Sequence, residues 1–208
     1  MPKILGGSLD EHRRQTRERL FTALGELMAE RGFEGITLAD ITARAGIGRT
    51  AVYNHFADKE ALLIEYVWSQ TEVFVATLDR ALAGVEDPVE RLRLYIRHDA
   101  RLSRDHHVPP ASDLRTVLSP ETLGRMREHA VLAERVMRSI IEDGIAAGHF
   151  APQPVEVTIR LINACLASRA VPTQEPERTE ALEAVEDFIM RAVGVRQHAT
   201  VGRVARVR

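Results

Sequence analysis

Apolar residues recur at intervals of three and four along most of the chain, which is the spacing of helices that bury one face. The first stretch predicts a helix over 11–30, and two short helices follow, one after Thr37 and one over about 48–56. Gly46 separates the short helices, and glycine readily adopts the left-handed backbone that ends a helix abruptly. Two short helices joined by a tight glycine turn predict a helix-turn-helix.

Five longer helices are predicted in the rest of the chain, because each apolar-periodic stretch is bounded by a capping residue, a proline or a glycine. Their expected ranges are 58–82, 87 to the Pro109-Pro110 break, 119–148, 155–170 and 176–193. No stretch alternates between apolar and polar residues with hairpin turns, and the sequence holds no internal repeat. The expected fold is therefore all-α.

The length of 208 residues suits one small unit and one larger core. We expect a helix-turn-helix domain over 11–57, with its motif at 37–56, and a larger helical domain over 58–194. The tail 195–208 is basic and lacks helical spacing, so we expect it to be mobile.

Composition excludes several classes of protein without selecting one. The net charge of −2 gives no sign of nucleic-acid binding, and the single cysteine, Cys165, excludes an intrachain disulfide and a cysteine-based zinc site within one chain. The chain starts without the apolar segment of a secretory signal and lacks a membrane-spanning apolar run, so a cytoplasmic protein is expected. Phosphate loops, nucleophile turns and HExxH helices are missing, so we expect neither an enzyme nor a cofactor.

The segment 37–62 reads TLADITARAGIGRTAVYNHFADKEAL and closely resembles the DNA-binding signature of the TetR family. The remaining helices resemble that family's nine-helix plan in outline only. The resemblance implies an N-terminal DNA-binding domain, a C-terminal domain for ligand binding and dimerisation, and regulation of transcription. Gly48 departs from the family, which often has serine there to cap the recognition helix, but glycine is only a slightly poorer cap.

The third short helix also has the physical pattern of a recognition helix. Gly48 and Ala51 are small enough for the backbone to approach a duplex, and Val52 and Phe56 lie four apart on the inward face. Arg49 is the expected base reader, because arginine donates two hydrogen bonds to the O6 and N7 atoms of guanine. The other interpretation is a compact three-helix unit with no nucleic-acid partner.

The predicted DNA-binding residues combine this outward face with the residues that match phosphate contacts of the family. By the resemblance, phosphate contacts are expected at Thr37, Tyr53, His55 and Lys59, and such contacts position a protein without specifying sequence. The full predicted set is Thr37, Arg44, Arg49, Thr50, Tyr53, Asn54, His55 and Lys59.

Polar residues on the inward face of the helix that begins at 87 predict a ligand pocket. Asp99, Ser103 and His106 share that face with apolar residues, and a buried carboxylate needs a partner or a solvent-filled cavity. The candidate lining is Tyr66, Gln70, Phe74, Tyr95, Asp99, Ser103, His106, Met126, Met137 and Asn163. Asp99 could instead pair with an arginine, and the methionines could simply fill the core.

A metal site is a second interpretation of the same helix, from His98, Asp99, Asp105, His106 and His107. Successive residues such as His106 and His107 point in different directions on a helix, so ordinary surface histidines and no metal are expected.

Two apolar rows on the helix over 155–170 predict a homodimer, because one helix cannot pack both against its own core. A broad apolar face on the last helix supports a four-helix bundle with a two-fold mate. The expected interface is Val157, Leu161, Ala164, Ser168, Leu182, Val185, Phe188 and Ile189. A two-fold DNA reader suits a palindrome with half-sites about one helical turn apart, or a multiple of it.

The resemblance implies a repressor that leaves a double-stranded DNA operator when a small-molecule effector shifts the helix over 58–82. A ligand does this only if it binds the two states unequally. Activation, corepression, and a ligand-independent or metal-responsive regulator with the same fold remain alternatives.

Overall fold

The computed structural model describes residues 6–105, 114, 117–166 and 174–195, and these form eight helices without a strand. The helices are α1 (Gly6–Arg31), α2 (Leu38–Ala45), α3 (Arg49–Tyr53), α4 (Lys59–Leu82), α5 (Pro88–Asp105), α7 (Pro120–Ala146), α8 (Val155–Leu166) and α9 (Glu177–Ala192). The all-α prediction is confirmed. The tail after 195 lies outside the described residues.

Two helices differ in length from the prediction. α1 begins at Gly6 rather than 11, and Arg14 bonds both Glu11 and Glu18 at 2.7 Å within it. Such pairs at three and four residues stabilise a helix that lacks a core to pack on. α3 ends at Tyr53 instead of reaching Phe56, although the amide of Phe56 still bonds the carbonyl of Val52 at 2.9 Å.

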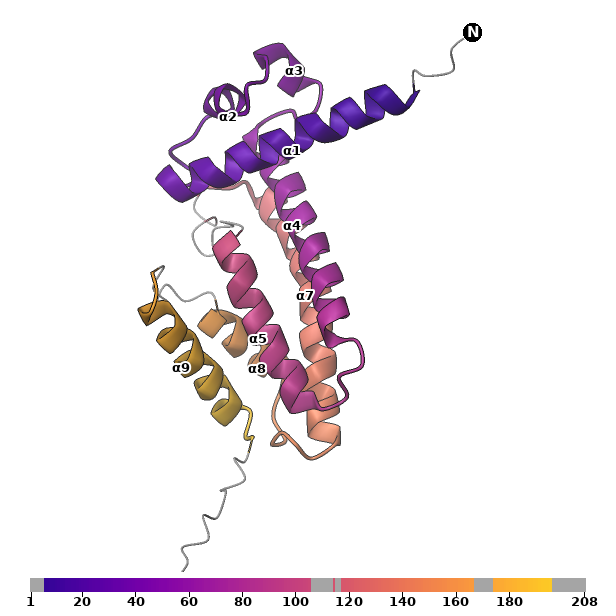
Figure 1. The fold of residues 1–208 in the computed structure, drawn as a ribbon, viewed down its shortest axis with the longest axis vertical. Coiled ribbons are helices and arrows are strands. Elements are labelled where there is room, and N and C mark those ends of the chain that lie inside the picture. Colours follow the sequence, from indigo (N-terminus) through magenta and orange to yellow (C-terminus); the bar gives the residue numbers. More distant parts are fainter. Residues whose placement is uncertain (1–5, 106–113, 115–116, 167–173, 196–208) are drawn as a thin grey trace, which may run out of the picture. The chain divides into compact units, whose positions relative to one another are not determined.

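The chain divides into two compact units, one of residues 1–83 and 97–136 and the other of residues 84–96 and 137–208. In the first unit α1 packs on α2 and α4, and α2 packs on α3 (Figure 1). Leu20, Leu24 and Leu27 of α1 are fully buried. They share one core with residues of α2, α3 and α4, including Ile41, Val52, Leu62, Leu63 and Tyr66.

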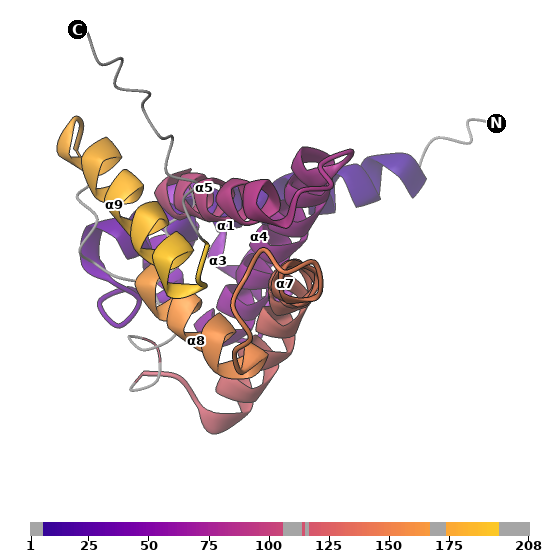
Figure 2. The same cartoon turned by 90° about the horizontal axis from the view of Figure 1, so that it is seen from below.

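The second unit has its own core, in which α8 and α9 lie side by side (Figure 2). Its buried residues include Leu92, Met137, Ile140, Ile159, Ile162 and Ile189. Gly144 makes room for the ring of Phe150, because a Cβ there would lie 2.1 Å from a ring carbon. Arg93 and Glu186 form an ion pair between α5 and α9, so this unit is held by charge as well as by apolar contact.

Candidate nucleic-acid interface

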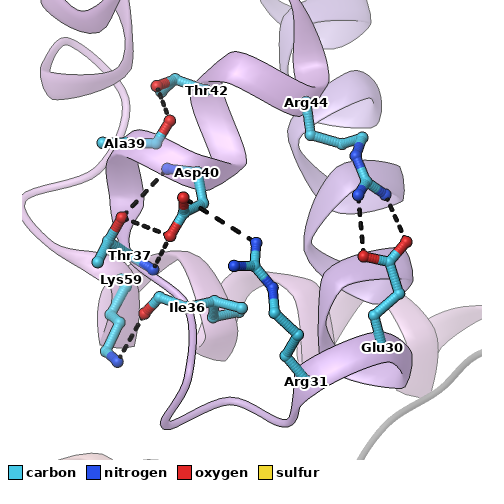
Figure 3. Close-up of polar contacts among 9 residues, drawn as sticks. All are labelled: Glu30, Arg31, Ile36, Thr37, Ala39, Asp40, Thr42, Arg44 and Lys59. Atoms are coloured by element: carbon cyan, nitrogen blue, oxygen red, sulfur yellow. Dashed lines mark hydrogen bonds and ion pairs between the residues drawn. The ribbon is translucent and has the colours of Figure 1, made fainter.

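A reciprocal cap at Thr37 fixes the start of α2 (Figure 3). The hydroxyl of Thr37 accepts from the amide of Asp40 at 3.2 Å, and the carboxylate of Asp40 accepts from the amide of Thr37 at 2.9 Å. Hydrogen bonds from the hydroxyl and the amide of Thr37 lower the pKa of Asp40. Together these two hydrogen bonds form a capping box at the start of the helix.

The turn between α2 and α3 depends on Gly46, whose φ is 64°. Its amide bonds the carbonyl of Ala43 at 3.2 Å, and the next amide, of Ile47, bonds the carbonyl of Thr42 at 2.9 Å. Arg19 of α1 donates to the carbonyls of Ala45 and Gly46 at 2.5 and 3.1 Å. The sequence pattern gave no sign of this anchor.

α3 presents its predicted face to solvent. Val52 and Phe56 are 1% and 5% exposed and hold the helix on the core, whereas Tyr53 is 64% exposed. Arg49, Thr50 and Asn54 are also exposed, and among the described residues no ion pair engages Arg49. Gly48 caps α3 without a side-chain hydrogen bond. The exposed side chains are of the kinds that contact base edges and phosphates.

Arg44 is turned toward α1. Its guanidinium donates to the two carboxylate oxygens of Glu30 at 2.9 Å each and to Glu26 at 3.2 Å, as Figure 3 shows for Glu30. Hydrogen bonds from Glu30, and then from Glu26, raise the pKa of Arg44. A DNA contact by Arg44 would have to compete with these two carboxylates.

Lys59 closes the loop that precedes α2. Its ammonium donates to the carbonyls of Phe33 and Ile36 at 3.2 and 3.0 Å and lies 4.7 Å from the centre of the Phe33 ring. An ammonium has three donors, so one is left for a phosphate. Lys59 thereby joins the start of α4 to the loop between α1 and α2.

His55 follows α3 and is half-buried against α1. Its ring centre lies 6.2 Å from that of Phe56, which in turn lies 6.3 Å from Phe21 of α1. Burial, followed by the positive charges of Arg13 and Arg17, lowers the pKa of His55 below 6.5. The imidazole is therefore mostly neutral at pH 7, and a phosphate contact by His55 would use it as a hydrogen-bond donor rather than as a cation.

A carboxylate that the sequence interpretation missed ties α4 to α7. Glu60 accepts hydrogen bonds from the hydroxyls of Thr122 and Ser119 at 2.6 and 2.8 Å, and from the amide of Ser119 at 3.2 Å. The Thr122 bond, followed by those of Ser119, lowers the pKa of Glu60. The first turn of α4, beside Lys59, is thereby joined to the start of α7.

The predicted pocket residues fall in both units. Tyr66, Gln70, Phe74, Asp99 and Met126 belong to the first unit, and Tyr95, Met137 and Asn163 belong to the second. Tyr66 packs on Phe21 at 5.8 Å in the helix-turn-helix core, where burial raises its pKa to about 12. The side chain of Ser103 and all of His106 lie outside the described residues.

Two polar side chains of the first unit stand out in the predicted pocket set. The side-chain oxygen of Gln70 is buried and, among the described residues, accepts no hydrogen bond. Burial raises the pKa of Asp99 to about 6, and its carboxyl has no hydrogen-bond or ion-pair partner among the described residues. Groups of this kind need a donor, because a buried acceptor without one costs free energy.

The metal interpretation involves His98, which has other partners. Its Nε2 lies 2.8 Å from the hydroxyl of Thr77, its ring packs on Phe74, and burial lowers its pKa. No group of three metal-ligating side chains occurs among the described residues, and His106 and His107 lie outside them.

The predicted dimer residues differ in exposure. Val157 and Leu161 of α8 and Phe188 of α9 are 44%, 62% and 54% exposed, whereas the opposite row of α8, Ile159 and Ile162, is buried. The two apolar rows predicted on this helix are therefore present. Ala164 is exposed, Leu182 and Val185 are half-buried, Ile189 is packed in the core of the second unit, and Ser168 lies outside the described residues.

A helix-turn-helix with an exposed recognition helix, attached to a larger all-α region, defines a DNA-binding transcriptional regulator. The family pattern for bacterial regulatory proteins of the tetR family matches residues 20–66, and the tetracyclin repressor-like C-terminal domain matches residues 88–191. The chain belongs to the TetR family, whose matched members are transcriptional regulators and not enzymes.

Relatives and solved structures agree with this assignment. An HTH-type transcriptional regulator of Mycobacterium tuberculosis, Rv1255c, is 29% identical over 61% of this chain. The match spans 63% of the length of Rv1255c, so this chain covers less than two thirds of that relative. The repressor KstR2 of the same organism is 23% identical over 70% of this chain and 75% of its own.

Two solved structures share the fold. FadR of Bacillus subtilis, in complex with stearoyl-CoA, has a TM-score of 0.73 at 18% identity over 86% of this chain and 99% of its own. PfmR of Thermus thermophilus has a TM-score of 0.69 at 26% identity over 86% of this chain and 100% of its own. None of the helices within the described residues is long and apolar enough to cross a membrane.

Proposed function

We propose that the protein is a cytoplasmic, homodimeric repressor that binds a palindromic operator and is released by a small-molecule ligand. Residues 11–57 would bind DNA, and residues 58–194 would bind ligand and dimerise. The observation that carries the proposal is the exposed face of α3, where Arg49 and Tyr53 project from a helix anchored by Val52. Arg49 would read a guanine, while Tyr53 and His55 would contact phosphates.

The homodimer rests on the exposed apolar side chains of α8 and α9. Val157, Leu161 and Phe188 expose apolar area on neighbouring helices of the second unit. In a two-fold dimer the same surface of both protomers forms the interface, so each of these side chains would be buried in both protomers. The two recognition helices would then face half-sites of an inverted repeat.

The ligand proposal rests on the buried oxygen of Gln70 and on Asp99. Both belong to the first unit, and neither has a hydrogen-bond partner among the described residues, so a ligand that donates hydrogen bonds would satisfy them. FadR, which shares the fold, binds stearoyl-CoA. Acyl-CoA thioesters are therefore the first compounds to test as effectors.

The contact between Glu60 and the start of α7 offers a route from ligand to DNA. Glu60 lies next to Lys59, whose ammonium holds the loop before α2. A ligand that moved α7 or α4 would therefore act on the placement of the helix-turn-helix. The shift requires that the ligand bind the DNA-free state more tightly.

Selection of bound sequences from a random duplex library tests the proposal. We expect enrichment of an inverted repeat, and we expect stearoyl-CoA or a shorter acyl-CoA to raise the Kd for that repeat. Enrichment of a single half-site would contradict the palindrome. An unchanged Kd and melting temperature across acyl-CoA chain lengths and a broad compound library would instead favour the ligand-independent regulator.

Asp99→Asn is expected to raise the melting temperature at pH 7.5 and to have a smaller effect near pH 4.5. The pKa of Asp99 is raised from 3.8 to about 6 by burial. The folded state therefore binds the carboxyl proton of Asp99 more tightly than the unfolded state does. The stability that this protonation contributes is lost as the pH rises through about 6. The amide carries no charge and avoids that loss.

Thermal unfolding of both proteins at several pH values measures the difference. Asp79→Asn, on the exposed face of α4, is the matched control and should not change the pH dependence. Destabilisation by Asp99→Asn at every pH would mean that Asp99 is paired with an arginine, as in the alternative interpretation.

A further inference from the structure

Arg13 lies on the same face of α1 as the buried leucines, in the N-terminal part of the helix that extends beyond the core. Leu20, Leu24 and Leu27 form the buried stripe of this helix, and Arg13 lies on the same face two turns before Leu20. Residues 10–15 are all exposed, so the part of α1 that contains Arg13 does not pack on the core. An arginine has taken the position where the apolar stripe would otherwise continue.

Ring contacts place this part of α1 beside the end of the recognition helix. The guanidinium of Arg17 lies 5.6 Å from the centre of the Phe21 ring, and Phe21 packs on Phe56 at 6.3 Å. Phe56 in turn packs on His55 at 6.2 Å. Arg13 precedes Arg17 by one turn on this face, and its positive charge helps to lower the pKa of His55.

The neighbouring charges of α1 are paired, whereas Arg13 has no ion-pair partner in the part of the chain that the structure describes. Arg14 bonds Glu11 and Glu18 at 2.7 Å each, and Arg17 bonds Glu65 of α4 at 2.6 Å. Within the described residues no ion pair or hydrogen bond engages the guanidinium of Arg13. Its positive charge is therefore available to a partner.

We propose that Arg13 forms a second phosphate-contact site on α1 that extends the DNA interface beyond the helix-turn-helix. The major groove is about 12 Å wide, so a phosphate backbone passes close to each end of a helix that lies in it. His55 lies just after the end of α3, and Arg13 adds a cation near it that has no partner among the described residues. The partner is the DNA backbone, because the site is continuous with the recognition face and has the opposite charge.

The test measures how DNA binding depends on salt, with a fluorescein-labelled 30-base-pair duplex of mixed sequence as the probe. Each phosphate contact contributes about 0.9 to the slope of log K against log salt concentration. Arg13→Ala should reduce the slope by about 0.9 and weaken binding by about eightfold at 0.1 M salt, which is what one such contact contributes at that concentration. Arg13→Lys keeps the charge and should retain most of the slope.

Arg14→Ala is the matched control, because it removes the same charge one residue away from a side chain that is already paired within α1. It should leave the slope unchanged. Equal slopes for Arg13→Ala and the wild type would overturn the proposal, and so would equal losses in the two alanine variants, which would show a general effect of net charge. If Arg13→Ala melts at a lower temperature, Arg13→Gln replaces it, since glutamine keeps part of the aliphatic stem.

Discussion

Arg49→Ala is expected to weaken binding to the operator about 5- to 150-fold and to weaken binding to random-sequence DNA much less. A bidentate contact between arginine and guanine contributes about 1–3 kcal/mol of discrimination against other bases. Arg49 is the first residue of α3, is exposed, and is not engaged by an ion pair among the described residues. Its loss removes a base contact without disturbing the core, because Val52 still anchors the helix.

Fluorescence anisotropy with the selected operator and a scrambled duplex of equal length measures the two affinities. Arg14→Ala is again the control for the loss of one positive charge, and it should preserve the ratio between the two affinities. The same fractional loss on both duplexes after Arg49→Ala would mean that Arg49 contacts phosphate only. The opposite patterns expected for Arg49 and Arg13 separate sequence reading from positioning.

Local signals made the helix-turn-helix predictable. The cap at Thr37, the turn at Gly46 and the inward face of α3 each depend on residues within a few positions of one another, so the sequence carries them directly. The length of α1 was less predictable, because glycines at 6 and 7 are poor helix formers, and the ion pairs of Arg14 with Glu11 and Glu18 stabilise only the turns that follow.

Partners that are distant in sequence were not predictable. Lys59 bonds carbonyls 23 and 26 residues earlier, and Glu60 bonds side chains 59 and 62 residues later. Backbone carbonyls and surface hydroxyls have no pattern that points to a particular partner. The predicted pocket suffers from the same limit, since helical periodicity identifies an inward face but does not say which core that face joins. Tyr66 illustrates it, because it packs in the helix-turn-helix core.

Leu161→Glu and Phe188→Glu are each expected to convert the protein from dimer to monomer. Burial of a large apolar side chain contributes about 2 kcal/mol, and two-fold symmetry doubles this, so each change should weaken dimerisation about a thousandfold. A buried carboxylate without a partner would weaken it further. Light scattering after size-exclusion chromatography measures the mass, and Val73→Glu, at a 45% exposed position of α4, is the control.

The dimer variants also decide how operator binding depends on symmetry. A monomer engages one half-site at a time, so it loses the benefit of having the second recognition helix held near the second half-site. Leu161→Glu should therefore bind a full inverted repeat no more tightly than a single half-site, whereas Val73→Glu should keep the preference of the wild type. A monomeric variant that still bound the full repeat with wild-type affinity would contradict the palindrome. A variant that stayed dimeric would show that the exposed residues of α8 and α9 serve another contact.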